Sequence, residues 1–288
     1  MIVRLLFLAK YRIPHLLFSL QWDNYIQGVD KTIVCSPMAK DEIWSILKHW
    51  NINVDNWDYI SDSVIYEKYP QVNDWVVAGD YRGWWLRQQA IKLSYLDLIQ
   101  QDVMLMWDPD TFLIQPYRAI DNNQLQLVTL LNTTHGSYEG VFKAITGYER
   151  PTQHCFVTEY MPVRKNDWIN LRNHIQQRWP DRHWLNAIID AVPGMPTVPP
   201  WGNGEIIKWF SEYELLGGWA VLQGNINYWP QARFEYNTLS KLNDLDIKKY
   251  NAVCDAIPDL RCSMQYDYEQ NKIPNFEEYY NIVKNKLC

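Results

Sequence analysis

The segment WWLRQQAIKLSYLDLIQQDVMLMWDPD, residues 84–110, decides the fold. Residues 84–101 lack Gly and Pro, are rich in helix-forming residues and are apolar on more than one side, which predicts a largely buried helix. The run VMLMW at 103–107 has the length and continuous apolarity of a central parallel strand covered on both faces. We expect this strand to end at Asp108-Pro109-Asp110.

The residues before this segment alternate between apolar runs of strand length and stretches with helical spacing. The predicted elements are strands at Ile2–Leu8 and Lys31–Cys35, helices at Ile13–Ile26 and Asp41–Trp50, and a weaker strand region at Tyr59-Ile60 and Val64–Tyr66. Strand–helix–strand order implies a parallel sheet with right-handed crossovers. The expected fold class is therefore α/β.

The second half of the chain is less regular. The predicted elements are an apolar stretch at Thr111–Ile114, strands at Leu125–Leu131 and Phe156–Val163, helices at Trp168–Arg178 and Glu205–Phe210, and a Pro- and Gly-rich loop at Asp190–Gly204. If the segment SEYEL, Ser211–Leu215, is a strand or strand end, Glu212 and Glu214 share a face of it. Residues after about 236 are polar and are predicted to be helical.

Composition excludes several classes of function. The formal net charge is −6, which argues against nucleic acid or an anionic membrane as the main partner. The five cysteines form no C-x-x-C pair and no zinc-finger spacing, so a reduced, cytoplasmic protein is expected. Charged residues and Pro14 interrupt the apolar N-terminus, no cleavage site follows, and no segment has the run of about 18 apolar residues needed to span a membrane.

The acidic pair Asp108 and Asp110 follows the predicted central strand. Open α/β sheets bind ligands beyond the carboxyl ends of their strands. Pro109 restricts the backbone between the two carboxylates. Two hard oxygen ligands suit Mn²⁺ or Mg²⁺. A plain acidic turn is the alternative, because D-P-D is also good turn chemistry.

These residues lead to a family resemblance. The run W-x-x-Q-Q-x-I-K-L, followed by an apolar strand and D-x-D, resembles glycosyltransferases of the GT-A fold, and the resemblance covers roughly residues 1–220. The segments VTEYMPV (157–163) and SEYEL resemble a poorly characterised bacterial and phage group of such transferases. The matching residues are Trp85, Gln88, Gln89, Ile91, Lys92, Leu93, Asp108, Asp110 and Glu159. Tyr160 departs from a usual His, and the H-x-x-G-x-x-K-P-W signature of one large retaining family is absent.

The resemblance implies a single GT-A domain with a mixed, mainly parallel central sheet flanked by helices. Its expected parts are a nucleotide-sugar-binding half at 1–120, an acceptor-binding half at 121–235 and a helical extension at 236–288. It implies transfer of a sugar from a nucleotide-diphosphate sugar, with UDP the preferred nucleotide, to a glycan or other hydroxyl acceptor. A divalent metal, Mn²⁺ or Mg²⁺, is expected on Asp108 and Asp110. A viral origin would place the activity in the host cytosol.

Further site residues follow from the resemblance and from position. Donor-binding roles are expected for Asp108 itself and for Lys10, Tyr11, Arg87, Gln88, Lys92 and Glu159. If the reaction inverts the anomeric centre, it needs a general base, for which Glu212 is preferred and Glu214 is the reserve. His135 and His154 are candidates on the acceptor side, and Trp201, Trp209 and Trp219 could stack on an acceptor sugar.

Rival interpretations stay open for several of these residues. Arg87 and Lys92 could be solvated helix charges, and Glu212 and Glu214 could hold a loop by hydrogen bonds. A retaining transferase on the same fold is one rival function. A non-catalytic sugar-binding protein is another, and a nucleotidyltransferase is a third, although AKYRIP after the first strand is not the Gly-rich phosphate loop that it would need.

Overall fold

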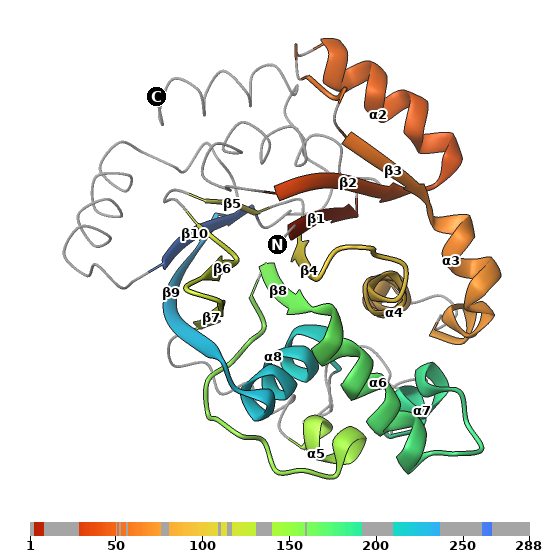
Figure 1. The fold of residues 1–288 in the computed structure, drawn as a ribbon. Coiled ribbons are helices and arrows are strands. Elements are labelled where there is room, and N and C mark those ends of the chain that lie inside the picture. Colours follow the sequence, from red (N-terminus) through yellow and green to blue (C-terminus); the bar gives the residue numbers. More distant parts are fainter. Residues whose placement is uncertain are drawn as a thin grey trace.

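The computed structural model describes twelve parts of the chain. They are residues 3–8, 29–49, 51, 53–55, 57–75, 81–108, 111–113, 117–130, 140–158, 160–191, 210–236 and 261–266. Figure 1 shows two sheets with helices packed around them. The strands are β1 Val3–Leu8, β2 Val29–Cys35, β3 Trp57–Ser61, β4 Val103–Trp107, β5 Thr111–Leu113, β6 Ile120–Asp121, β7 Gln124–Leu130, β8 Tyr160–Arg164, β9 Ile226–Tyr236 and β10 Arg261–Tyr266.

The helices are α2 Pro37–His49, α3 Asp62–Lys68, the 3₁₀ helix η2 Pro70–Trp75, α4 Tyr81–Leu96, α5 Val141–Thr146, α6 Lys165–Arg178, α7 Trp184–Ala191 and α8 Glu212–Gln223. In the first half of the chain one or more helices separate β2, β3 and β4, and in the second half α5 precedes β8 while α6, α7 and α8 follow it. Helix α2 begins at Pro37. Proline is favoured in the first turn of a helix because backbone N–H groups there have no partner within the helix, so its missing N–H costs nothing.

The first sheet has the strand order β3-β2-β1-β4-β8. Strands β3, β2, β1 and β4 are parallel, and β8 runs antiparallel to β4. This confirms the predicted mixed, mainly parallel sheet of an α/β fold. The strand order reverses at β1, because β2 lies on one side of it and β4 on the other. Ligands in open α/β sheets bind at such a reversal, beyond the carboxyl ends of the strands.

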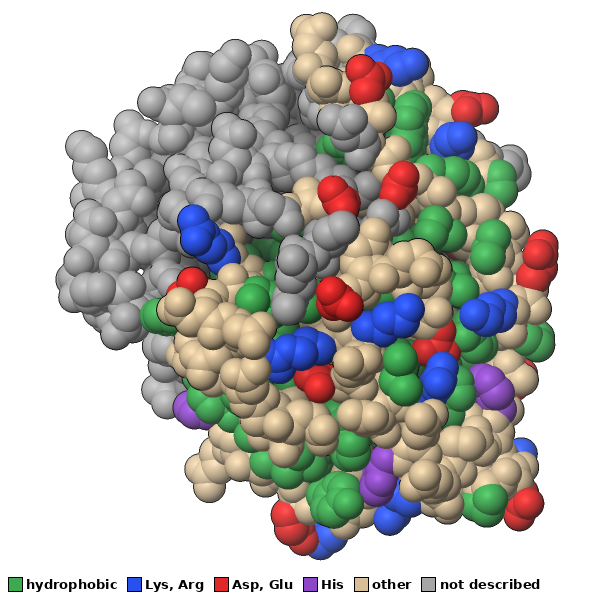
Figure 2. Space-filling model, viewed as in Figure 1, with side chains coloured by type: hydrophobic (Ala, Val, Ile, Leu, Met, Phe, Trp, Pro, Cys, Tyr) green, Lys and Arg blue, Asp and Glu red, His purple; other side chains and the backbone are tan. Residues whose placement is uncertain are grey.

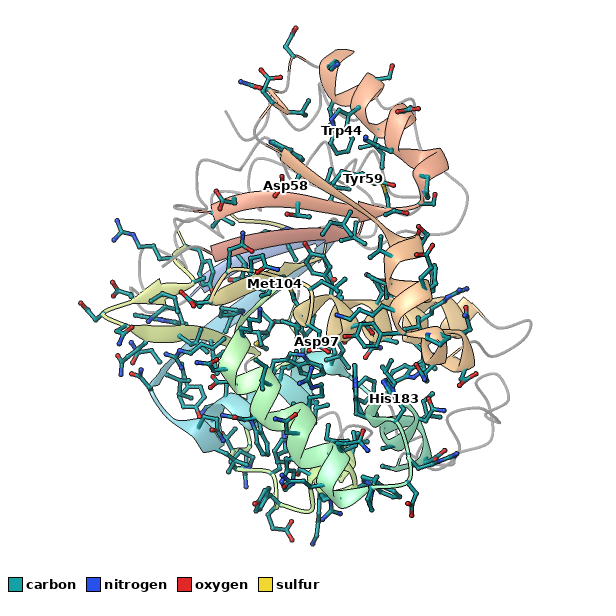
Figure 3. The ribbon with its side chains drawn as sticks, turned by 45° about the vertical axis from the view of Figure 1, so that its right-hand side comes forward. Trp44, Asp58, Tyr59, Asp97, Met104 and His183 are labelled. Atoms are coloured by element: carbon teal, nitrogen blue, oxygen red, sulfur yellow. The ribbon has the colours of Figure 1, made fainter. Side chains whose placement is uncertain are left out.

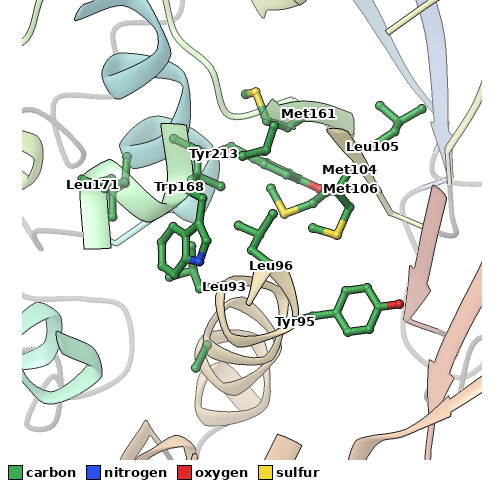
Figure 4. Packing of buried hydrophobic residues seen from close by; sticks show 14 of the residues in the cluster. Leu93, Tyr95, Leu96, Met104, Leu105, Met106, Met161, Trp168, Leu171 and Tyr213 are labelled. Atoms are coloured by element: carbon green, nitrogen blue, oxygen red, sulfur yellow. The ribbon is translucent and has the colours of Figure 1, made fainter. Parts of the chain in front are cut away.

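Strand β4 forms the centre of the core. All five of its residues are buried, and none is more than 1% exposed. Figure 4 shows Met104 and Met106 turned towards Leu96 of α4, whereas Leu105 points to the other side of the strand. Full burial of one such side chain contributes about 1.5–3 kcal/mol of hydrophobic stabilisation. The prediction of a buried helix followed by a doubly covered strand is confirmed, although α4 ends at Leu96 rather than near residue 101.

A polar contact centred on Asp97 fastens the end of α4 to its neighbours. Its carboxylate accepts hydrogen bonds from the hydroxyl of Tyr69 (2.7 Å) and from the indole of Trp168 (2.6 Å), and it pairs with Arg172 of α6 (2.8 Å). Figure 3 labels Asp97, with His183 beside α7. These contacts hold α4 and α6 together below the first sheet, and thereby fix the helix that carries Lys92.

The second sheet has the order β5-β10-β9-β7-β6. Strand β10 pairs parallel with β9 and antiparallel with β5, the strand that follows the acidic pair. The sequence predicted only helix after residue 236, and that prediction is wrong for Arg261–Tyr266 because these residues form β10. The division into residues 1–120, 121–235 and 236–288 stays a prediction.

Two other local predictions are wrong. Val64–Tyr66 lie in α3, not in a strand, and the hydroxyl of Ser61 caps that helix by accepting from the backbone N–H of Ser63. The segment SEYEL is not a strand either, because Ser211 is the N-cap of α8 and Glu212 is its first residue. Asp190 and Ala191, predicted as the start of a loop, are the last two residues of α7.

Candidate active site

The carboxylate of Asp108 lies directly beyond the carboxyl end of β4, next to the reversal in strand order. Strand β1 ends alongside it, because Phe7 of β1 is in register with Trp107. The Asp108 side chain is 23% exposed. Its Oδ1 accepts a hydrogen bond from Nζ of Lys92 at 2.6 Å and from the hydroxyl of Tyr213 at 3.2 Å. Among the described residues, none makes a hydrogen bond or ion pair with its Oδ2.

Lys92 is the centre of this arrangement. Its side chain is 3% exposed, and Nζ donates to Asp108 Oδ1 at 2.6 Å, to Glu212 Oε1 at 2.8 Å and to the Tyr213 hydroxyl at 3.0 Å. An ammonium group has three N–H donors, so all three are in use. Lys92 was predicted to contact the donor phosphates, but in this geometry it has no hydrogen left to donate to them. We call Lys92, Asp108, Glu212 and Tyr213 the Lys92 cluster.

The first turn of α8 supplies two members of the cluster. Ser211 caps the helix, its hydroxyl accepting from the backbone N–H of Glu214 at 3.4 Å. The side-chain oxygen of Gln89, which lies one turn before Lys92 on α4, accepts from the backbone N–H of Glu212 at 2.9 Å. Both bonds satisfy donors that a helix start leaves without partners. They fix the position and direction in which Glu212 and Tyr213 enter the cluster.

The charges of the cluster do not cancel. Lys92 carries one positive charge and faces two carboxylates, Asp108 and Glu212. Burial lowers the pKa of Lys92, but these two carboxylates outweigh it and hold that pKa well above its ordinary value. Burial raises the pKa of Glu212, and Lys92 lowers it in opposition. Burial and the negative charge of Asp108 also raise the pKa of Tyr213, so its hydroxyl keeps its proton. With both carboxylates ionised, the cluster carries one negative charge more than Lys92 compensates, and a bound cation would neutralise it.

Glu214 points to a different part of the molecule. Its Oε1 accepts from the backbone N–H of Phe156 at 2.7 Å, and its Oε2 pairs with Arg150 at 2.8 Å. The guanidinium of Arg150 also donates to the backbone carbonyl of His154 at 2.6 Å. Glu214 therefore holds the loop that follows α5, as the rival interpretation of this residue expected. The Lys92 cluster does not include it.

Glu212 is also engaged inside the protein. Its side chain is 4% exposed, and Lys92 donates to its Oε1. A general base must come within hydrogen-bond reach of the acceptor hydroxyl. The described contacts of Glu212 favour a role in positioning Lys92 and Asp108 over a role as general base. Which residue acts as the general base stays a prediction.

Arg87 and Gln88 take different places on α4. Arg87 donates to the side chain of Asn73 at 2.8 Å, and its guanidinium carbon lies 4.4 Å from the ring centre of Tyr66. It projects about 140° away from Lys92 around the helix, towards α3 and η2. Gln88 lies one turn before Lys92 on the same face and is half-buried. Gln88 is thus the better placed of the two for a ligand at the cluster.

The acceptor-side candidates that the structure describes lie elsewhere. Trp219 is 6% exposed and belongs to the core, so packing and not stacking on a sugar explains it. The ring of His154 lies 5.1 Å from that of Tyr228, away from the cluster. Several predicted site residues lie outside the described residues, namely Lys10, Tyr11, Asp110, His135, Glu159, Trp201 and Trp209. The same is true of the predicted helix Ile13–Ile26 and of the predicted helix Glu205–Phe210, except for Phe210 itself.

The described part of the site can be tested for its fit to a divalent metal. The excess negative charge of the cluster and the available Oδ2 of Asp108 both suit a hard cation. Within the described ranges no three His, Cys, Asp or Glu side chains gather as a complete metal site. Asp108 therefore fits as one ligand of a site that would need others, such as Asp110 or the oxygens of a ligand.

Sequence reasoning did not single out Tyr213 or Gln89 as cluster residues. The signal that could have found Tyr213 is the pattern S-E-Y-E, because Ser followed three residues later by Glu marks a helix start. With the helix placed, Glu212 and Tyr213 become first-turn residues of a helix N-terminus. Their partner Lys92 is 120 residues away from Glu212 in sequence, and no local pattern predicts that contact.

The described part of one face of the molecule is mixed in charge. Figure 2 shows Lys and Arg side chains interspersed with Asp and Glu side chains on the described part of one face, without a large basic area. In the part of the chain that the structure describes, no helix is both long enough and apolar enough to cross a membrane.

Comparison with solved structures adds the fold class. Two structures of the galactosyltransferase LgtC are similar to this chain, each with a TM-score of 0.50. One is an active-site mutant (11% identity), and the other is a complex with donor and acceptor sugar analogues (10% identity). Both comparisons cover 99% of this chain and 96% of LgtC. Mouse xyloside xylosyltransferase 1 is similar at a TM-score of 0.45 and 8% identity, over 95% of this chain and 99% of that enzyme.

Sequence comparisons add no family assignment. No protein-family model matches the chain, and no curated protein sequence matches it. The likeness to LgtC at this level of identity concerns the fold alone. Together with the strand order and the helices on the first sheet, it identifies the architecture as the GT-A fold of glycosyltransferases.

Proposed function

We propose that this chain is a metal-dependent glycosyltransferase that moves a sugar from a nucleotide-diphosphate sugar, preferably a UDP-sugar, to a glycan or other hydroxyl acceptor. The observation that carries the proposal is the Lys92 cluster at the strand reversal of a GT-A fold. It presents a partly exposed Asp108, one oxygen of which makes no hydrogen bond or ion pair with a described residue, beside an uncompensated negative charge.

Asp108 and Asp110 would hold the metal, because the carboxylate oxygens of both residues are hard ligands that suit Mn²⁺ or Mg²⁺. When bound, such an ion acts as a Lewis acid on phosphate oxygens, an effect of several kcal/mol on the charge of a leaving diphosphate. The chain itself would orient the ion: Lys92 and Tyr213 hold Oδ1 of Asp108 and leave Oδ2 to face the ligand. Gln88 would contact the donor from the same face of α4.

A second candidate is retention of the anomeric configuration instead of inversion. It is favoured by the finding that both predicted bases, Glu212 and Glu214, are engaged by Lys92 and by Arg150. NMR of the product distinguishes the two outcomes by the coupling constant of the anomeric proton. In either case we expect Glu214→Gln to act through the loop that it holds, and not through loss of a base.

The donor is found by thermal-shift measurement of the purified chain against a panel of nucleotide sugars, each with Mn²⁺ and with EDTA. A ligand that binds only the folded state raises its stability by mass action, so no acceptor has to be known. We expect one nucleotide sugar to raise the melting temperature only with Mn²⁺, and the effect to disappear in Asp110→Asn. Binding of free glycans without any response to nucleotides would support the sugar-binding protein instead.

A further inference from the structure

Two residues of the Lys92 cluster come from a helix that begins more than a hundred residues after the acidic pair. Resting on the function proposed above, we infer that Glu212 and Tyr213 are positioning residues for the metal-binding carboxylate of Asp108. Tyr213 acts on Asp108 directly and through Lys92, whereas Glu212 acts on it through Lys92 alone. Together they would set the affinity of the site for its cation.

The geometry around Asp108 determines which of its two carboxylate oxygens can face a cation. Oδ1 of Asp108 accepts from Lys92 at 2.6 Å and from the Tyr213 hydroxyl at 3.2 Å. Two donors from two different helices on one oxygen fix the rotation of the carboxylate. The other oxygen, Oδ2, is then the one that can face a cation, while the partial exposure of Asp108 gives access to it.

Lys92 would compete with a metal ion for Asp108 if its other partners were absent. Glu212 and the Tyr213 hydroxyl take two of the three hydrogens of its ammonium group. Glu212 also compensates the charge of Lys92, so that the charge of Asp108 remains available to a second cation. Without Glu212, Lys92 would pair with Asp108 alone, and the pair would be neutral.

The support for Glu212 and Tyr213 is rigid. The backbone N–H of Glu212 is held by Gln89, and Ser211 caps the helix start. The Tyr213 ring is buried and lies 4.5 Å from Nζ of Lys92, measured to the ring centre. These contacts fix the backbone at the start of α8, from which both side chains project into the cluster. Partners that orient a metal ligand in this way typically change metal affinity about 10- to 100-fold.

The same helix turn supplies a matched control. Glu214 is two residues from Glu212, is similarly buried and is also paired with one cation. Its partners are Arg150 and Phe156, and it does not contact Asp108. Glu212→Gln and Glu214→Gln therefore remove the same charge from the same turn, but only the first change should reach the metal site.

The experiment is a titration of Mn²⁺ into the full-length chain, with and without UDP, in which electron paramagnetic resonance measures the free ion. We expect Glu212→Gln and Tyr213→Phe to raise the dissociation constant for Mn²⁺ about 10-fold or more. Glu214→Gln should change the dissociation constant for Mn²⁺ by no more than about two-fold. Melting temperatures of all variants serve as the control that each of them is folded. Asp108→Asn is the reference for loss of the ligand itself.

The outcomes separate the two proposals. If the unaltered chain binds Mn²⁺, Asp108→Asn abolishes binding and both Glu212→Gln and Tyr213→Phe bind as the unaltered chain does, the positioning role is overturned and the metal site stands. An equal loss in Glu212→Gln and Glu214→Gln would also overturn it, because a general effect on α8 would then explain the result. If the unaltered chain binds no Mn²⁺ even with UDP, the proposed metal site fails and the positioning role fails with it.

Discussion

Nζ of Lys92 lies 2.6 Å from Oδ1 of Asp108, and this ion pair joins the largely buried helix α4 to the end of the central strand. One partner is 3% exposed and the other 23%. The pair therefore lies at the boundary between the core and the surface where a ligand can enter. Glu212 and Tyr213 complete it from α8, so the site exists only when both halves of the chain are folded.

Replacing Lys92 by Met should strongly destabilise the protein. Asp108 and Glu212 would be left as two carboxylates without their counter-ion in a buried place, and removal of one partner from a buried ion pair costs about 3–5 kcal/mol. Urea denaturation of the two proteins measures the difference in the free energy of unfolding. The matched control is Lys143→Met, because Lys143 and Glu149 form an exposed pair. Such a pair contributes about 1 kcal/mol or less, and equal losses in both variants would contradict the role given to Lys92.

Gly217→Ala should destabilise α8 although alanine favours helices over glycine by about 1 kcal/mol. A Cβ at this position would lie 2.7 Å from Cδ2 of Phe156 and closer still to its Cγ, and the side chain of Phe156 is fully buried. Overpacking of this kind costs about 1–3 kcal/mol. Calorimetry of the single variant should show a lower melting temperature.

A double-mutant cycle tests the cause of that loss. In a Phe156→Ala background the ring is gone, so adding Gly217→Ala should be neutral or stabilising. A loss of the same size in both backgrounds would mean that something other than contact with Phe156 excludes a side chain at residue 217.

His183 predicts how stability depends on pH. It precedes α7, and its Nδ1 accepts from the backbone N–H of Leu185 at 3.3 Å, which requires that nitrogen to be unprotonated. Burial lowers the pKa of His183 below its ordinary 6.5, against the raising effect of Asp97. The unfolded chain therefore binds a proton more readily than the folded one. The contribution to stability is complete above pH 6.5 and is lost as the pH falls through the lower folded-state pKa.

His183→Asn isolates this effect, because asparagine is a good helix cap and does not titrate in the range about pH 5–7.5. Denaturation across that range should show a smaller loss of stability on acidification in the variant than in the unaltered chain. Parallel pH profiles of the two proteins would contradict the assignment.

The part of the fold that sequence predicts well is the part that local pattern determines. Residues 84–107 are a long helical run followed by a continuous apolar strand, and both elements are present. Short segments such as SEYEL are ambiguous between helix and strand. Where an element is buried on all sides, the spacing of its apolar residues shows neither the period of a helix nor that of a strand. In α8 every residue from Glu212 to Ala220 is buried, and only the cap at Ser211 indicates a helix.

The candidate site shows the same division. Asp108 could be predicted because it follows a recognisable strand at a sheet edge. Lys92 and Glu212 could be singled out as candidate site residues, but their contact with each other depends on how α8 packs against α4. The roles assigned to Lys92 and Glu212 from sequence, phosphate binding and base catalysis, differ from the positioning roles that their three short contacts favour.

The most direct test of the central claim is the rate at which nucleotide is released from the nucleotide sugar that the thermal-shift screen finds. This rate is measured with Mn²⁺ for the unaltered chain, Asp108→Asn and Asp110→Asn. The account predicts release that EDTA abolishes and that falls about 100-fold or more in each variant, the size expected for losing several kcal/mol of charge stabilisation. Melting temperatures confirm that the variants are folded. Full turnover in both variants, or turnover that is unaffected by EDTA, would contradict the claim that this chain transfers sugar with a metal held by Asp108 and Asp110.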